Sequence, residues 1–179
     1  GMGRTGKWWA HEHYEFKPDV ITSAKALQVG AVISTKEMFP QEPGSISSTW
    51  GGGQTLDLAI GLETIKIIKQ KKLLQHNKKM GEYLRERLKE LPVNNVRGFG
   101  LMTAFDVARP KTRNDVVLEC IKNGLAILAC GNQGIRVIPP YIVTEKQIDE
   151  GIKIISKAIN KCQVKGFKHR GNVCEITGC

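Results

Sequence analysis

The amino-acid sequence predicts a mixed α/β fold, and three features of its 179 residues support that prediction. Two short β-prone runs, residues 20–22 and 31–35, are joined by a connection that contains Gly30, which favours two adjacent strands. Two long segments with helical periodicity follow them. Short strands and helices then alternate as far as residue 159. This order of elements is typical of α/β proteins, in which helices cover a sheet.

The two long helical segments differ in how their apolar residues are distributed. In the helix that begins at Thr55, apolar residues fall on more than one face, so we expect that helix to be largely buried. The second helix, over residues 73–91, is amphipathic, with one apolar stripe and a charged opposite face. Pro92 ends it, because proline cannot continue a helix.

The last third of the chain predicts a small α/β unit. Its expected elements are a strand over residues 101–107, a helix over 112–123, and strands over 125–129 and 135–138. The final helix has the clearest signal, because Thr144 and Gln147 match a capping box. Isoleucines then recur at helical spacing up to residue 159, so we expect this helix to pack on the preceding strands.

The composition is that of an ordinary globular protein, with 41% hydrophobic and 25% charged residues. No apolar run approaches the roughly 20 residues of a membrane span, and the first residues lack the organisation of a signal peptide. We therefore expect a cytoplasmic protein without a membrane partner. The five cysteines show no CxxC pair and no regular spacing, so we expect free thiols.

The net charge of +10 is compatible with nucleic acid, an anionic cofactor or a basic surface. Basic residues gather in residues 66–79 and 157–170, without the interleaved aromatic residues of a single-strand binder. A solvated basic surface is the favoured interpretation, and a nucleic-acid-binding module rests on charge alone.

Lys25 follows the first β-prone run directly, and a lysine in such a place is most often a solvated surface residue. However, residues 3–13 (GRTGKWWAHEH) and 18–25 (PDVITSAK) resemble class-III aminotransferases in order and spacing, especially 4-aminobutyrate aminotransferases. In that family the lysine at this place forms a Schiff base with pyridoxal 5'-phosphate and moves a proton between the substrate carbon and the cofactor. The resemblance therefore implies both roles for Lys25. An amine attacks an aldehyde only when it is neutral, so its pKa must be depressed.

Two further motifs resemble the same family. Residues 48–52 (STWGG) are similar to its Thr-aromatic-Gly-Gly element, whose threonine reaches the cofactor phosphate of the neighbouring protomer, and Thr49 is the matching position. The residues that follow the two glycines depart from the family pattern, and an ordinary glycine turn is the alternative. Residues 134–140 (GIRVIPP) resemble the small-domain strand whose arginine meets the substrate carboxylate or pairs with an active-site glutamate. Arg136 is therefore the candidate carboxylate clamp, since a planar guanidinium suits bidentate binding, and a structural ion pair is its alternative.

His11 and His13 raise the question of a metal site, because two histidines at alternate positions of a strand place both rings on one face. No further set of ligands follows at a plausible spacing. The same His-Glu-His stands in the aminotransferases that the chain resembles, so we expect packing and hydrogen bonding and no metal.

The resemblance runs from about residue 1 to residue 160 and implies part of a fold-type-I aminotransferase. Residues 1–91 would be the C-terminal part of the large cofactor-binding domain, and residues 92–160 the small C-terminal α/β domain. Residues 161–179 lie past the family's usual end, show no apolar repeat, and are expected to form a loosely packed basic tail.

The activity that the resemblance implies is amino transfer from an omega-amino acid, such as 4-aminobutyrate, to a 2-oxo acid such as 2-oxoglutarate. The family's earlier half, with the phosphate loop and the residues that hold the ring, has no counterpart here. We therefore expect the isolated chain to bind pyridoxal 5'-phosphate weakly or not at all, and to associate as a homodimer or larger oligomer through exposed edges. A truncated, inactive product is the alternative.

Overall fold

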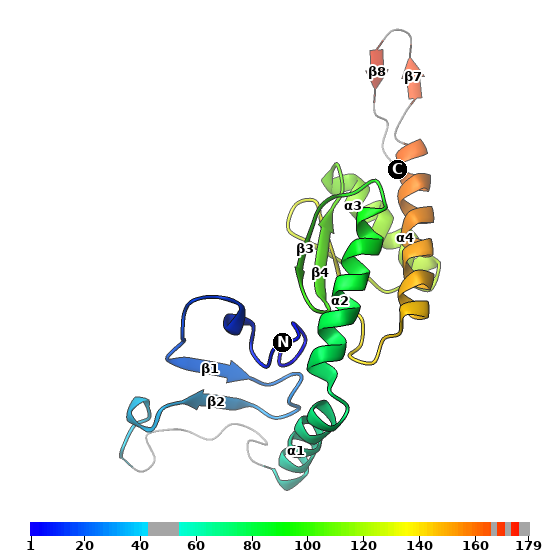
Figure 1. Ribbon diagram of the computed structural model, residues 1–179. Helices are drawn as coiled ribbons and strands as arrows, with labels where there is room; N and C mark the ends of the chain where they lie inside the picture. Colours follow the sequence, from blue (N-terminus) through cyan, green and yellow to red (C-terminus); the bar gives the residue numbers. More distant parts are fainter. Residues whose placement is uncertain (43–53, 166–167, 171–172, 176–179) are drawn as a thin grey trace. The chain divides into compact units, whose positions relative to one another are not determined.

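The computed structural model describes residues 1–42, 54–165, 168–170 and 173–175, with side chains up to Cys162 (Figure 1). The chain divides into two compact units, Gly1–His76 and Asn77–Cys179. No helix among the described residues is long and apolar enough to cross a membrane. The domain boundary expected after residue 91 stays a prediction.

The first unit is built on a β-hairpin followed by a helix. Its elements are η1 (Ala10–His13), β1 (Val20–Ser23), β2 (Ala31–Ser34), η2 (Lys36–Met38) and α1 (Thr55–Gln70). Strands β1 and β2 pair antiparallel, with Val20 opposite Ser34 and Ser23 opposite Ala31. The prediction of two adjacent strands around Gly30 is confirmed.

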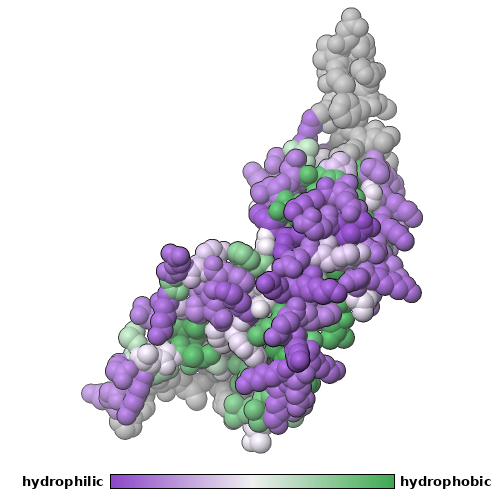
Figure 2. All heavy atoms as spheres, viewed as in Figure 1, coloured by the Kyte–Doolittle hydropathy of each residue, from purple (hydrophilic) through white to green (hydrophobic). Residues whose placement is uncertain are grey.

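Helix α1 forms where the sequence predicts it, but the expectation that it is largely buried is wrong. Along the helix only Gly61 and Ile68 are buried, whereas Leu56 is 67% and Leu62 is 55% exposed, and apolar surface is visible over α1 (Figure 2). A Cβ at Gly61 would lie 3.1 Å from the carbonyl oxygen of Leu27, so the described residues of this unit cover the side that carries Gly61. Apolar residues on several faces of a helix indicate that other protein segments pack on those faces. The pattern does not show whether those segments belong to the same part of the chain.

The second unit is a four-stranded antiparallel sheet with helices packed on one face. Its sheet has the strand order β3-β4-β6-β5, and the helices α2, α3 and α4 contribute to a shared core with it. Figure 1 labels these three helices beside β3 and β4. A separate antiparallel pair, β7 with β8, follows. The elements are α2 (Leu73–Lys89), β3 (Asn94–Phe99), β4 (Met102–Asp106), α3 (Pro110–Lys122), β5 (Leu128–Cys130), β6 (Gly134–Val137), α4 (Glu145–Lys165), β7 (Lys168–Arg170) and β8 (Val173–Glu175).

The core of this unit confirms the helical stripes that the sequence predicts. The apolar stripe of α2 is buried from Met80 to Leu88, and the isoleucines of the α4 stripe (Ile148, Ile152, Ile155 and Ile159) are at most 5% exposed. The capping box is also confirmed, because the amide of Thr144 donates to Gln147 Oε1 at 3.0 Å and the amide of Gln147 donates to Thr144 Oγ1 at 3.3 Å.

Three features of this unit differ from the sequence prediction. Strand β3 was not predicted, because its residues do not alternate between apolar and polar, and β5 begins three residues later than expected. The prediction of a loosely packed tail from residue 161 is wrong for its first residues, because α4 continues to Lys165 and Cys162 is 5% exposed. Cys162 extends the isoleucine stripe as a small apolar residue. Lys161 Nζ also lies 2.6 Å from Glu119 Oε1, which ties this turn of α4 to α3.

Helix α2 crosses the turn between β3 and β4 at very short range. The turn has Gly100 at φ 49°, the first central residue of a two-residue hairpin loop, where glycine is favoured. A Cβ at Gly81 of α2 would lie 1.9 Å from the carbonyl oxygen of Gly100. Arg85, one turn further along α2, donates from Nη1 to the same oxygen at 3.1 Å. A side chain at position 81 is therefore incompatible with this crossing.

Candidate functional site

Lys25 lies two residues beyond the end of β1, in a turn closed by the amide of Leu27, which donates to the carbonyl of Ala24 at 2.8 Å. Its side chain is exposed at the edge of an open hollow of about 330 Å³. The residues that line this hollow are Ala24, Lys25, Gln28, Val29 and Gly30. Lys25 carries the ionisable side chain in that set. Because this side chain is exposed at the edge of the hollow, its amine is accessible to a small molecule that enters the hollow.

The backbone next to Lys25 is held in an unusual conformation. Gln28 has φ 64°, in the left-handed region that costs a residue other than glycine about 1–3 kcal/mol. The Gln28 side chain donates from Nε2 to the carbonyl of Lys25 at 2.8 Å. This hydrogen bond closes the turn from the other side and fixes the backbone that carries the lysine.

A second open hollow, of about 350 Å³, lies along the ends of β1 and β2 and shares Ala24 and Gly30 with the first. Its lining includes the hydroxyl-bearing residues Thr22 and Ser23. An accessible amine at the edge of an open hollow fits the aldehyde end of pyridoxal 5'-phosphate. Sequence reasoning did not single out Thr22 and Ser23, although their place just before Lys25 is visible in the sequence.

Thr49, the position matched to the cofactor phosphate, lies outside the described residues. Its assignment therefore stays a prediction.

Arg136 lies in the middle of β6, on the face of the sheet opposite to the helices. The sheet register aligns it with Ala104 of β4 and with Leu128 of β5, and Arg97 of β3 is aligned with Ala104 from the other side. Its neighbours along the strand, Ile135 above all, point into the core. Arg136 is exposed, and none of the ion pairs among the described residues includes it.

The other arginine of this face is paired. Arg97 Nη1 donates to Asp106 Oδ1 at 2.8 Å, and Asn95 Nδ2 donates to Asp106 Oδ2 at 2.8 Å. Burial raises the pKa of Asp106, but the hydrogen bonds from Asn95 and Arg97 and the charge of Arg97 outweigh it and hold the pKa below its usual value. Asp106 is therefore a firmly ionised carboxylate on the same face as Arg136. Sequence reasoning missed this group, because it depends on strand register.

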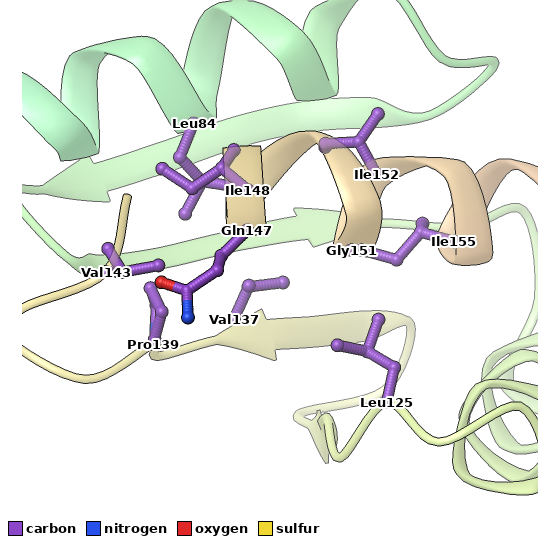
Figure 3. A pocket seen from close by; sticks show the side chains of 10 residues that line it. All are labelled: Leu84, Leu125, Val137, Pro139, Val143, Gln147, Ile148, Gly151, Ile152 and Ile155. Carbon is purple, nitrogen blue, oxygen red and sulfur yellow. The ribbon is translucent and has the colours of Figure 1, made fainter. Parts of the chain in front are cut away.

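A small apolar cavity of about 60 Å³ lies between α4 and the sheet of the second unit (Figure 3). Its one polar lining side chain is Gln147, which caps α4. Ligand pockets usually measure about 300–1,000 Å³, so this cavity is a packing gap and not a substrate site.

Comparison with known proteins decides the family. The family model described as aminotransferase class-III matches residues 1–159. The chain belongs to the class-III aminotransferase family. Acetylornithine aminotransferases are among its relatives: the protein from Archaeoglobus fulgidus is 38% identical over 160 residues, which are 87% of this chain and 41% of that protein. The acetylornithine aminotransferase from Bacillus subtilis is 38% identical over 168 residues, which are 89% of this chain and 43% of that protein.

Solved structures of class-III aminotransferases agree with the fold. The lysine aminotransferase from M. tuberculosis matches with a TM-score of 0.82 and 28% identity, over 90% of this chain and 40% of that one. The ornithine aminotransferase from Plasmodium yoelii matches with a TM-score of 0.77 and 34% identity, over 90% of this chain and 46% of that one. The prediction of a partial fold-type-I aminotransferase is confirmed. The chain spans about two-fifths of the length of the curated relatives.

Class-III aminotransferases use pyridoxal 5'-phosphate, which agrees with the cofactor expected from the sequence. Within this class-III chain, Lys25 belongs to the first unit and Arg136 to the second, and their roles stay predictions. His11 and His13 lie in the 3-10 helix η1 and not in a strand, and the ring of His11 lies 6.1 Å from that of Phe16. Among the described residues no three potential ligands are grouped around a metal position.

Proposed function

We propose that this chain is the C-terminal portion of a pyridoxal-phosphate-dependent aminotransferase that moves an amino group from an amino acid with a distal amine to a 2-oxo acid such as 2-oxoglutarate. The observation that carries the proposal is the accessible amine of Lys25, which a fixed turn presents beside an open hollow at the end of β1. Membership of the class-III family gives that amine its chemistry.

Lys25 would attach the cofactor aldehyde through its neutral amine, and the same nitrogen would hold and move the proton at the substrate carbon. When bound, the cofactor supplies the electron sink that stabilises negative charge at that carbon. Thr49 is the matched position for the cofactor phosphate, and Thr22 and Ser23 line the second hollow, which shares Ala24 and Gly30 with the hollow that Lys25 lines.

Arg136 would bind a substrate carboxylate, because its guanidinium is exposed, carries no ion pair among the described residues, and stands on a strand paired on both sides. The names of the relatives, acetylornithine, lysine and ornithine aminotransferase, favour a donor of the ornithine type. 4-Aminobutyrate, the donor expected from the sequence, also carries a distal amine and a carboxylate. Turnover of N-acetylornithine and of 4-aminobutyrate, measured side by side in the complete enzyme, distinguishes the two.

The second candidate is a truncated product that folds without the cofactor. The observation that favours it is the exposed apolar surface of α1, where Leu56, Leu58 and Leu62 are each more than half exposed. Such surface favours association, and a homodimer or larger oligomer in the cytoplasm is part of our proposal in either case.

Reductive trapping tests the role of Lys25. The chain is incubated with pyridoxal 5'-phosphate and borohydride, digested, and analysed by mass spectrometry for the modified lysine. Trapping accumulates product even when binding is weak, so we expect label on Lys25 in preference to Lys36, an exposed lysine of the same unit. Lys36→Ala should leave the labelling of Lys25 unchanged. Equal labelling of the two lysines, or none on Lys25, contradicts the proposal.

A further inference from the structure

The outer face of the four-stranded sheet holds two arginines in different electrostatic states. Arg97 and Arg136 flank Ala104 across β4 in the sheet register, and Ala104 carries only a methyl side chain between them. Arg97 is neutralised by Asp106, with Nη1 2.8 Å from Oδ1. Arg136 has no carboxylate partner in the described part of the chain, so one of the two charges on this face is available to a ligand.

Asp106 is also close enough to Arg136 to compete for it. In the register of β4 and β6, Asp106 is opposite Gly134, and Arg136 is opposite Ala104 two residues away, so the two are diagonal neighbours on one face. Diagonal neighbours of an antiparallel pair lie about 7–8 Å apart, within the reach of long side chains. Gly134 has no side chain to separate them, and Asp106 Oδ1 lies 3.2 Å from the place where a Cβ of Gly134 would be.

Two hydrogen bonds turn the Asp106 carboxylate toward β3 instead. Arg97 engages Oδ1, and Arg97 Nη1 also donates to the carbonyl of Asn95 at 2.9 Å. Asn95 engages Oδ2, from a residue with φ 49° inside a register shift of β3. The irregular backbone of β3 thus directs the side-chain amide of Asn95 toward the carboxylate of Asp106. Bulges commonly change the direction of a side chain in this way.

We propose that Arg97 and Asn95 are positioning residues that hold the Asp106 carboxylate away from Arg136 and so keep Arg136 free to bind the substrate carboxylate. This inference rests on the proposed function of Arg136. Without Arg97, Asp106 loses its ion pair, and without Asn95 it loses a charge-assisted hydrogen bond to Oδ2. The released oxygen can then turn to Arg136, the cation diagonal to Asp106 on the same face. A substrate carboxylate must then displace the carboxylate of Asp106 from Arg136.

The test is a titration of the 179-residue chain with glutarate, followed by the NMR signals of the arginine side chains. Wild type should show a response centred on Arg136, and Arg136→Ala should abolish it. Arg97→Gln and Asn95→Ala should each weaken binding roughly two- to fivefold, the range for a competing exposed ion pair. Asp106→Asn in the Arg97→Gln background should restore the wild-type affinity, because the competing carboxylate is gone.

Lys122→Ala is the matched control, since it removes one positive charge from an exposed position of α3 and should leave the affinity unchanged. Binding in wild type that does not depend on Arg136 overturns the proposed role of Arg136 and this inference with it. Binding that depends on Arg136 but is unchanged in both Arg97→Gln and Asn95→Ala overturns the inference alone. Weakened binding that Asp106→Asn does not restore also overturns it, because the loss then comes from a disturbed hairpin.

Discussion

Replacement of Gly81 by alanine tests the crossing of α2 over the β3–β4 turn. The new Cβ would stand 1.9 Å from the carbonyl oxygen and 2.1 Å from the carbonyl carbon of Gly100. The two segments would have to move apart by about 1.5 Å to reach ordinary contact at 3.4 Å. That movement breaks the hydrogen bond from Arg85 to Gly100 and displaces Leu101, which is fully buried.

The size of the effect follows from these terms. Overpacking of a core costs about 1–3 kcal/mol, and loss of a hydrogen bond from a charged donor costs about 1.5–3 kcal/mol. Alanine recovers up to about 1 kcal/mol as the better helix former. We expect Gly81→Ala to lower the free energy of unfolding of the second unit by roughly 1.5–5 kcal/mol.

Gly151→Ala is the matched control within the same unit. A Cβ there would meet Leu125 Cδ1 at 3.7 Å, an ordinary contact, at the edge of the small cavity (Figure 3). We expect it to stabilise the unit by about 0.5–1 kcal/mol. Native-state hydrogen exchange of the β4 and β6 amides measures both changes in the unit concerned. A neutral or stabilising Gly81→Ala would refute the close crossing.

Three further predictions concern single side chains. Lys25→Ala in the complete enzyme should abolish transamination without unfolding the protein, because the side chain is exposed; circular dichroism and turnover together check this, and near-wild-type turnover would refute the role. Arg136→Lys should raise the Michaelis constant for acidic substrates, since a point charge cannot replace a bidentate fork, and an unchanged constant for both donor and oxo acid would remove Arg136 from substrate binding. Burial raises the pKa of the Cys120 thiol from its ordinary value of 9.0 to about 11, and the charge of Glu119 adds to that, so the neutral thiol stabilises the fold fully below pH 9.0. As pH rises from 9.0 toward 11, stability on the order of 2 kcal/mol should be lost, and this loss should be absent from Cys120→Ala in urea titrations at several pH values.

The sequence predicted those elements that depend only on residues close together in the chain. The capping box at Thr144 needs only residues within one turn, and the isoleucine stripe needs only one helix face, so both could be found without knowledge of the fold. The hairpin whose connection contains Lys25 was found for the same reason, because glycine and β-prone runs mark it directly. Burial of α1 could not be predicted, since it depends on what lies beside the helix.

The candidate site was predictable only in part, for a similar reason. Lys25 and Arg136 stand in motifs that are continuous in sequence. Asn95, Arg97 and Asp106 do not form a motif, because their contacts arise from the pairing of β3 with β4 and from a register shift that no local pattern indicates. Strand β3 has no apolar alternation, so neither the strand nor the group built on it could be read from the sequence.

The pairing of the strands also determines the order in which the backbone around Lys25 and the backbone around Arg136 lose their structure. Arg136 lies on β6, whose backbone is hydrogen-bonded to β4 on one side and β5 on the other. Lys25 lies in the connection between β1 and β2, which form a two-stranded hairpin, a structure of marginal stability by itself. A mild denaturant should therefore free the backbone that carries Lys25 while β6, the strand of Arg136, remains protected. Carboxylate binding by this chain would then persist at denaturant concentrations where trapping of Lys25 has already failed.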